Sequence, residues 1–327
     1  MSWKKTVKHS LKRSPHLWQA LIQLQRFGLL AQSWFYPARN FSLAYSLDSG
    51  TDGGTISPPV FSRPTSQLVT VSQFFEAEYR HWCKEIRSQL RFNRKTWEFN
   101  FILQVLDSKG LLGAGKKGLG FGCGEEPLPA VMVSRGVEVV ASDQSFESAK
   151  QQGWADTAQH TGSLPKLNSL SIARDDDFSR LCTLREVDMN RIPADLTSGQ
   201  FDFCWSACAF EHLGSIEKGL QFVENSLEAL KPGGLAVHTT EFNLSSNDNT
   251  LEDPTCVVFR KRDIESLVKI LTSKGHHVFP VNYHPGDQRL DDYVDLPPYQ
   301  GSPSLKLKLA QYVVTSIGLV IRKGPTG

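Results

Sequence analysis

Short apolar runs alternate with amphipathic segments along most of the chain from residue 117 onward. The apolar runs are bounded by turn residues, and they predict strands at 117–121, 137–142, 183–187, 201–206 and 234–240. Helical spacing of apolar positions predicts helices at 127–135, 144–153, 215–230 and 262–274. Two later runs, near 276–281 and 312–322, predict a terminal strand pair. Strand–helix alternation of this kind predicts a parallel sheet with right-handed crossovers.

The preceding residues follow a different pattern. Aromatic and aliphatic residues at helical spacing predict a helical lead-in or cap over residues 67–113, packed on a sheet edge or roofing a site. Residues 47–66 are rich in Gly, Pro, Ser and Thr, which predicts a linker or an irregular surface loop. The predicted division is therefore an arm and linker at 1–66, the lead-in at 67–113, and an α/β domain at 114–324.

The N-terminal arm is strongly basic. No Asp or Glu precedes Asp48, and seven Lys and Arg residues give the arm a charge of +7, so a net charge of +2 leaves −5 for the remainder. Leu17, Leu21 and Leu24 follow helical spacing. A basic amphipathic helix can lie on an anionic membrane, serve as a cleaved organelle presequence, or dock on the acidic core of its own chain. These three alternatives stay open.

Composition narrows the class of protein. The chain has 327 residues, of which 40% are hydrophobic and 21% charged, which suits one large α/β domain with additions or two small domains. No apolar run reaches the length of a membrane span. Six cysteines are scattered without a Cys-x-x-Cys pair. This pattern favours reduced thiols in a cytoplasmic protein over disulfides or a metal site, so no metal is predicted.

A glycine-rich turn, Gly118-Leu-Gly-Phe-Gly-Cys-Gly-Glu-Glu126, ends the first predicted strand and precedes a helix. Glycines at alternate positions expose bare backbone, and N–H groups at a helix start can face polar ligand atoms. Asp143 follows Gly124 by nineteen positions, at the end of the next apolar run. A carboxylate there is placed to accept both hydroxyls of a ribose. Together these features predict a nucleoside-cofactor site.

The sequence of the glycine-rich turn excludes two kinds of phosphate-binding motif and favours another type of cofactor. The dinucleotide fingerprint Gly-x-Gly-x-x-Gly/Ala fails from every possible starting glycine. Residues 110–117 approach a phosphate-binding loop but lack its Ser/Thr and precede the strand, so a simple turn is the better interpretation. Two carboxylates, Glu125 and Glu126, follow the glycines. Bare backbone beside carboxylates suits a cofactor with a cationic end, such as S-adenosylmethionine.

Over about residues 97 to 323, the chain resembles the class I S-adenosylmethionine-dependent methyltransferases. Five landmarks in the correct order carry the resemblance: the glycine turn, Asp143, Glu186-Val-Asp-Met189, Phe201–Leu213 with its Glu-His-Leu end, and Leu230-Lys-Pro-Gly-Gly234. The resemblance implies a Rossmann-like, doubly wound, mostly parallel seven-stranded sheet, here with an N-terminal helical extension. Its first motif usually has an acid where this chain has Gly120 and a glycine at Glu126, and Glu125 is the expected substitute for the acid.

The resemblance and the strand-end positions together give a set of expected site residues. Those expected to bind the cofactor are Gly120, Gly122, Gly124, Glu125, Asp143, Asp188, Met189 and Ser206. His212, in the Glu-His-Leu segment, is the candidate general base, because histidine titrates near neutrality. Its alternative role is a structural histidine in a turn. Glu241 is expected to orient His212 or to serve as a second acceptor-site carboxylate.

The acceptor is predicted from two polar segments that could form a lid, 243–250 and 283–299, which supply Tyr, Asp and Asn. Such side chains favour a polyhydroxylated acceptor over a nucleic acid, which would require basic residues along the site. The predicted function is O-methylation of a sugar, glycolipid or other polar small molecule. N- or C-methylation of another metabolite, and a methyltransferase-like scaffold without activity, are the alternatives. The protein is expected to be cytoplasmic, with possible membrane contact through the arm.

Overall fold

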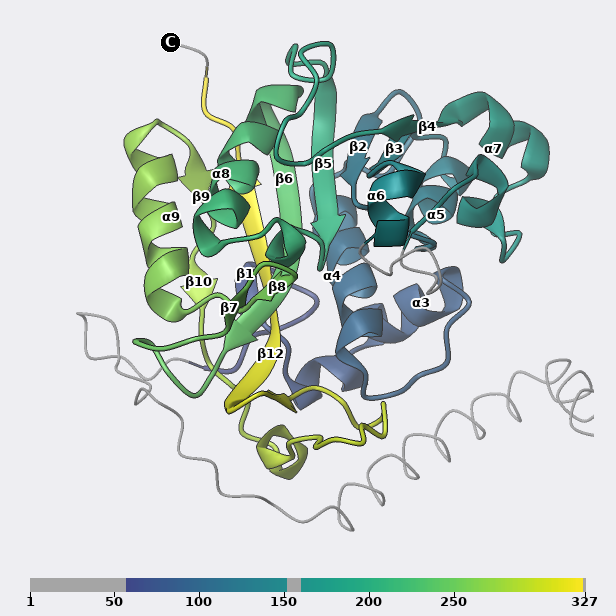
Figure 1. Cartoon of the computed structure of the whole chain (residues 1–327). Coiled ribbons are helices and arrows are strands. Elements are labelled where there is room, and N and C mark those ends of the chain that lie inside the picture. Colours follow the sequence, from purple (N-terminus) through teal and green to yellow (C-terminus); the bar gives the residue numbers. More distant parts are fainter. Residues whose placement is uncertain (1–56, 152–159, 326–327) are drawn as a thin grey trace, which may run out of the picture.

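The computed structural model describes residues 57–151 and 160–325. One large sheet runs through these residues in the strand order β10-β1-β12-β6-β5-β2-β3-β4, with β9 and β11 added beside β12 (Figure 1). The predicted basic arm, residues 1–46, lies outside the described residues.

The centre of the sheet is parallel, as the strand–helix alternation predicts. The parallel strands are β2 (Lys117–Phe121), β3 (Glu138–Asp143), β4 (Cys182–Glu186), β5 (Phe201–Ala207) and β6 (Leu230–Asn243). The last strand, β12 (Tyr312–Arg322), runs antiparallel to β6 over nine residue pairs from Val314↔Asn243 to Arg322↔Leu235. The sheet thus confirms the doubly wound, mostly parallel fold.

The described residues hold ten strands in this sheet, where the resemblance implied seven. The three additional strands are short, and all lie on the β12 side: β1 (Ser66–Leu68), β10 (Val281–Asn282) and β11 (Leu307–Leu309). The strand β9 (His277–Val278) falls within the predicted run near 276–281 and pairs antiparallel with β12, as the predicted terminal pair requires. β1 pairs with both β10 and β12, so the region expected to end a linker contributes a strand to the sheet. A separate hairpin joins β7 (Glu252–Asp253) to β8 (Cys256–Val257).

Helices cover both faces of the sheet (Figure 1). One face carries α3 (Ala77–Glu85), α4 (Arg94–Ser108), α5 (Leu128–Ser134) and α7 (Asp175–Leu181). The other face carries α8 (Ile216–Ser226) and α9 (Lys261–Ser273). The short helix α6 (Phe146–Gln151) follows β3, and five 3-10 turns complete the described helices: η1 (Val71–Phe75), η2 (Leu164–Asn168), η3 (Phe210–His212), η4 (Leu227–Ala229) and η5 (Arg289–Asp292).

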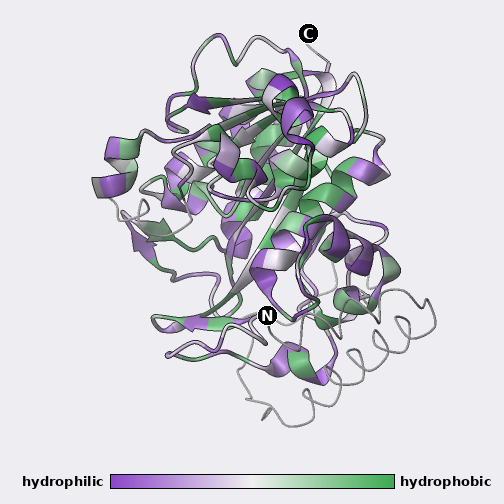
Figure 2. Cartoon of the chain, turned by 90° about the vertical axis from the view of Figure 1, so that its right-hand side faces the viewer, coloured by the Kyte–Doolittle hydropathy of each residue, from purple (hydrophilic) through white to green (hydrophobic). Residues whose placement is uncertain are grey.

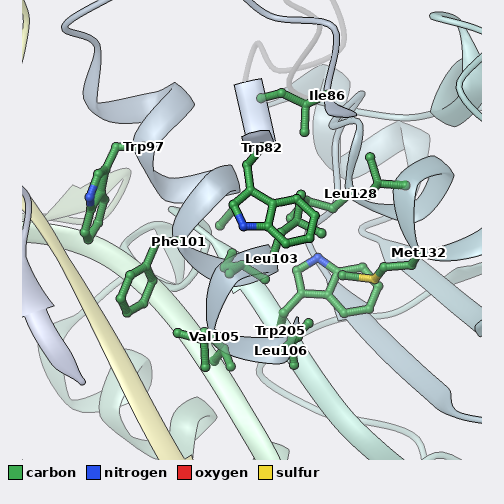
Figure 3. Packing of buried hydrophobic residues seen from close by; sticks show 14 of the residues in the cluster. Trp82, Ile86, Trp97, Phe101, Leu103, Val105, Leu106, Leu128, Met132 and Trp205 are labelled. Carbon is green, nitrogen blue, oxygen red and sulfur yellow. The ribbon is translucent and has the colours of Figure 1, made fainter. Parts of the chain in front are cut away.

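Helix α4 is a core helix, whereas residues 67–113 were predicted to pack at an edge or to roof a site. The side chain of Asn93 caps its first turn by accepting a hydrogen bond from the Thr96 N–H at 3.0 Å. Trp97 and Phe101, which stack with ring centroids 4.8 Å apart, are fully buried. The helix packs across β5, β6 and β12, and its apolar side chains continue into a cluster that includes Trp205 and Met132 (Figure 3). Nine of its fifteen residues are buried, including the polar Glu98, Asn100 and Gln104, so the helix lies inside the domain.

Polarity follows this layering. Hydrophobic residues concentrate on the inner strands and on the helix faces turned toward them, and hydrophilic residues on the periphery (Figure 2). Phe61, which lies in the predicted linker, is completely buried. That part of the chain therefore belongs to the core, and a linker can extend no further than residue 56. In the described part of the chain, no helix combines the length and apolarity that crossing a bilayer requires.

The close approach of α4 to β12 gives the first prediction. Gly318 lies in β12 directly beneath Phe101, and a Cβ atom at this glycine would overlap the phenylalanine ring. We expect Gly318→Ala to lower the free energy of unfolding by about 1–3 kcal/mol, the usual cost of overpacking a core. Chemical denaturation measures it. Gly113→Ala is the matched control, because a Cβ atom at Gly113 would meet nothing within 4 Å. Equal stabilities of the two variants would contradict the tight packing of α4 on β12.

Candidate functional site

A cavity of about 660 Å³ opens at the carboxyl ends of β2, β3, β4 and β5. This edge is where doubly wound sheets bind ligands, because the strand order reverses there. Most of the residues expected at the site line the cavity: Gly122, Gly124, Glu125, Asp143, Asp188, Met189 and His212. Other lining residues were not among the expected site residues: Lys95 and Phe99 of α4, Glu126 and Cys208.

The glycine turn adopts the backbone geometry that its composition predicts. Gly122 has φ = 59°, a left-handed conformation that is costly for residues with a Cβ. A Cβ there would lie 2.7 Å from Cβ of Ala209 and 3.3 Å from Sδ of Met189. The N–H of Cys123 donates to the Ser142 carbonyl at 3.0 Å, which fixes the turn to the end of β3. Bare backbone is thereby held at the cavity wall.

Asp143 organises the backbone around the cavity. Its Oδ2 accepts hydrogen bonds from the N–H of Gly124 at 3.0 Å and of Thr161 at 3.1 Å, and its Oδ1 accepts from the N–H of Gln144 at 2.8 Å. Burial raises the pKa of this carboxyl, and the three backbone donors oppose the rise. A carboxylate has about four acceptor positions, so capacity remains for a ligand hydroxyl. Ribose binding by Asp143 stays a prediction.

Asp188 and Met189 lie at the other wall of the cavity, after β4. The Oδ1 of Asp188 accepts from the Asn190 N–H at 2.9 Å, which turns the chain at this point. Met189 is nearly buried against Gly122. The pair therefore lies directly across from the glycine turn, as an adenine-binding segment would.

Gly120 was expected to bind the cofactor, but the structure places it elsewhere. It is buried and does not line the cavity. Its Cβ position is filled by the indole ring of Trp205 and by Sγ of Cys123. Trp205 projects from β5 into the core beside Leu106 and Met132 (Figure 3). The missing side chain at Gly120 thus makes room for a tryptophan and not for a ligand.

Glu126 supplies the carboxylate that Gly120 lacks. Its Oε1 accepts a hydrogen bond from Nε1 of Trp205 at 2.7 Å, and the residue lines the cavity although it is almost wholly buried. Burial raises the pKa of Glu126 to about 8, opposed by the hydrogen bond from Trp205 and by the Lys95 ammonium. The acid expected at position 120 therefore appears six residues later, where the family has a glycine. Glu125, the expected substitute, instead forms an ion pair with Lys166 at 2.7 Å.

Ser206 was also expected to bind the cofactor, and this expectation is wrong. Its hydroxyl is fully buried 2.8 Å from Nδ1 of His238, on the opposite face of β5 from Trp205. Side chains alternate between the two faces of a strand. Trp205 and Ala207 therefore point toward α4 and Ser206 toward α8. A position near the end of a strand is therefore not sufficient to place a side chain in the site. The side chain must also lie on the right face of the strand.

The two candidate catalytic residues have different surroundings. His212 lines the cavity, and its Nδ1 lies 2.7 Å from the carbonyl oxygen of Thr255 in the β7–β8 turn. Glu241 is buried at the end of β6, and its Oε1 lies 2.6 Å from Nη2 of Arg94. The contact that fixes the imidazole is thus a backbone carbonyl. Glu241 is not among the residues that line the cavity, so the structure supports neither of the two roles expected for it.

Cys208 also lies at the cavity wall. It has φ = 48°, a left-handed conformation that is uncommon for a residue other than glycine. Its N–H donates to the carbonyl of Thr239 at 3.0 Å, and its thiol donates to Oε1 of Glu98 at 3.0 Å. Strained residues concentrate at functional sites. No motif in the sequence would have singled out this cysteine.

The fold and the cavity define a doubly wound protein with a nucleoside-type site at the carboxyl edge of its sheet. Residues 119–238 match the family model described as a methyltransferase domain. This match agrees with the prediction of an S-adenosylmethionine-dependent methyltransferase, which the sequence landmarks carried. No curated protein matches the chain.

Solved structures with a related fold have low sequence identity. A candidate sarcosine dimethylglycine methyltransferase from Galdieria sulphuraria has a TM-score of 0.45 and 16% identity over 76% of this chain and 99% of its own. The methyltransferase domain of bacterial CtHen1 has a TM-score of 0.43 and 13% identity over 70% and 100%. An S-adenosylmethionine-dependent methyltransferase from Clostridium acetobutylicum ATCC 824 has a TM-score of 0.39 and 13% identity over 75% and 97%. We base no assignment of substrate on these similarities.

The raised pKa of Glu126 gives a prediction about stability. The folded state binds more protons than the unfolded state between the ordinary glutamate pKa and about 8, so this group lowers the free energy of unfolding as pH rises through that window. Glu126→Gln retains an oxygen acceptor for Trp205 and cannot ionise. We therefore expect the variant to gain stability relative to the wild type from about pH 5 to 8.

Chemical denaturation at several pH values measures this difference. Glu125→Gln is the control, because it removes a charge from the neighbouring position, where the carboxylate pairs with Lys166 at the surface. The other groups acting on Glu126 are Cys123, Lys95 and Asp143, and both variants retain them. A stability difference for Glu126→Gln that stays constant from pH 5 to 8 would contradict a buried, largely protonated Glu126.

Proposed function

We propose that this protein transfers the methyl group of S-adenosylmethionine to a hydroxyl oxygen of a polar small molecule or glycan, with His212 as the general base. The observation that carries the proposal is the position of His212 at the wall of the cavity that also contains the glycine turn, Asp143 and Asp188. A base and a cofactor site in one cavity are what oxygen methylation requires.

The cavity offers a matching group for each part of the cofactor. In this proposal Asp188 and the N–H of Met189 bind adenine, and Asp143 binds the ribose hydroxyls. Glu126 is the carboxylate best placed for the ammonium group of the methionine part, because it is buried at the cavity wall beside bare glycine backbone. A charge-assisted hydrogen bond to a desolvated carboxylate is stronger than one to a surface group. The cofactor when bound supplies an electrophilic methyl on a sulfonium.

The proposed reaction moves one proton and one methyl group. The acceptor oxygen attacks the methyl carbon, the bond from carbon to sulfur breaks, and the sulfonium becomes a neutral thioether. His212 takes the hydroxyl proton. Donation from Nδ1–H to the Thr255 carbonyl at 2.7 Å assigns the ring lone pair to Nε2. A backbone carbonyl can therefore orient the imidazole, and no carboxylate partner is needed.

The acceptor class rests on the residues around His212. Lys95 and Cys208 offer polar atoms there, and Phe99 and Leu213 offer apolar surface. The Nζ of Lys95 lies 5.4 Å from the centroid of the Phe99 ring. Such a mixed wall suits a molecule with both hydroxyl groups and an apolar ring face, as a sugar has. The segments 243–250 and 283–299, which were expected to form a lid, contribute none of the described residues that line the cavity.

Removal of the proposed base is the main test. His212→Ala should lower kcat by about 10²–10⁴-fold, the usual contribution of a positioned base, with little change in affinity for S-adenosylhomocysteine. Methyl transfer from labelled cofactor to glycan and polar-metabolite fractions measures the rate. His277→Ala, at an exposed position in β9, is the control.

The outcomes separate the alternatives. Near-normal kcat in His212→Ala would return this histidine to a structural role and would favour an N- or C-nucleophile that needs no base. Failure of the wild type to bind S-adenosylhomocysteine in calorimetry would favour a scaffold without activity. Binding without transfer to any hydroxylated fraction would overturn the acceptor class alone.

Proton release on binding tests the role of Glu126. An ammonium group favours the ionised carboxylate, so below the pKa of about 8 binding should release up to one proton, and the affinity should rise with pH by up to about tenfold per unit. Calorimetry with S-adenosylhomocysteine in buffers of different ionisation enthalpy measures this release. Glu126→Gln should abolish it, whereas Glu125→Gln should retain it. Equal release from wild type and Glu126→Gln would assign the ammonium to another group.

A further inference from the structure

A cluster of buried ionisable groups lies behind the cavity wall at Cys208. We propose that Cys208, Glu211 and Glu241 form a binding site for a divalent transition-metal ion of the Zn²⁺ class. One potential ligand atom from each residue lies within 4.8 Å of those of the other two. The proposal does not depend on O-methylation, because it concerns binding of an ion to these three side chains.

Three separate elements bring these ligands together. Cys208 directly follows β5, Glu211 lies in η3, and Glu241 is near the end of β6. The left-handed backbone of Cys208 is held in place by two hydrogen bonds from its N–H, to the carbonyl of Thr239 at 3.0 Å and to the hydroxyl of Thr239 at 3.2 Å. The ligand positions are thus determined by rigid strand ends, which is what a preorganised metal site needs.

Each carboxylate keeps one oxygen without a partner. Oε1 of Glu211 and Oε2 of Glu241 are inaccessible to solvent and have no hydrogen-bond donor among the described residues. Only 1% of the Glu211 surface is exposed. An unsatisfied buried carboxylate oxygen is costly, so such a group usually indicates an absent partner. Two such carboxylates, each with a ligand atom within 4.8 Å of the Cys208 thiol, point to a cation.

The other oxygens of these carboxylates are already held. Oγ1 of Thr240 donates to Oε2 of Glu211 at 3.0 Å, and Nη2 of Arg94 lies 2.6 Å from Oε1 of Glu241. Outer partners of this kind orient metal ligands before the ion binds. Each side chain therefore presents one oxygen and is fixed through the other.

The balance of charge also favours a cation. The cluster contains a third buried carboxylate, Glu98, which lies 3.4 Å from Lys95 and 3.5 Å from Arg94. Three carboxylates, those of Glu98, Glu211 and Glu241, thus lie near two basic side chains, Arg94 and Lys95.

The donor set selects the type of ion. One thiolate and two carboxylate oxygens suit Zn²⁺ or Co²⁺, whereas Mg²⁺ and Ca²⁺ prefer oxygen ligands alone. Binding must remove the thiol proton, and the thiol already donates to Glu98 at 3.0 Å. Cys208 lines the cavity, so a fourth coordination position can face it. An ion there would bind an oxygen or nitrogen of the molecule that occupies this end of the cavity.

Titration of the full-length protein with Co²⁺ after treatment with a chelator tests the proposal. We expect one ion per chain, with the near-ultraviolet charge-transfer absorption that a thiolate–cobalt bond produces, lost on addition of Zn²⁺ and retained with Mg²⁺. Cys208→Ser should abolish this absorption. Glu211→Gln should weaken binding by more than about tenfold, since loss of even an outer partner commonly costs that much.

The control is Cys256→Ser, which removes the other half-buried thiol near the cluster and should leave the absorption unchanged. Circular dichroism and affinity for S-adenosylhomocysteine show whether each variant is folded. No charge-transfer absorption in the wild type at saturating Co²⁺ would overturn the proposal, whatever the variants do. Absorption that persists in Cys208→Ser, or that disappears in Cys256→Ser, would overturn the assignment of the thiol. Cofactor binding by the wild type without metal binding would reject this site and leave the proposed function intact.

Discussion

The burial of the first turn of α4 against the ends of β5 and β6 is the constraint on which the site depends. Apolar packing of Trp97 and Phe101 holds this helix across the sheet. Its first turns thereby bury the carboxylate of Glu98 and place the half-buried Arg94 and the more exposed Lys95 beside it. Charges can be buried there only because they are paired. The Nζ of Lys95 also donates to the carbonyl of Ala207 at 3.0 Å, so the same side chain fixes the end of β5. The cavity is built on these contacts, which explains why the N-terminal helices cannot be regarded as a detachable cap.

The exchange of side chains around Trp205 shows how a departure from a family motif can be compensated. A glycine at position 120 would leave a void in a packed core, but the indole of Trp205 occupies this space. The indole N–H then requires an acceptor, and Glu126 provides it at 2.7 Å. Trp205, Gly120 and Glu126 therefore depend on one another: Gly120 leaves room for the indole ring, and Glu126 accepts the hydrogen bond from the indole N–H. A carboxylate is still present at the cavity wall, and the motif is altered without losing its acid.

Much of the fold could be predicted from the sequence, because the central strands and helices carry strong local patterns. The predicted strand 117–121 coincides with β2, and the predicted helix 262–274 differs from α9 by one residue at each end. The strand β1 could not be predicted, since three residues acquire strand structure only by pairing with β10 and β12. Strand parity along β5 would have excluded Ser206 from the site. The role of Glu126 and the convergence of Cys208 with Glu211 and Glu241 arise from contacts between distant segments, for which one sequence holds no signal.

Lys95 connects the two charged regions of the cavity. Burial acts to raise the pKa of both Glu126 and Glu98, and the Lys95 ammonium acts in the opposite direction on each carboxyl. For Glu98 the combined effect of Lys95 and Arg94 outweighs burial, so its pKa is lowered. For Glu126 burial prevails. The Lys95 ammonium thus acts on both carboxyls, and its effect is larger on Glu98 than on Glu126.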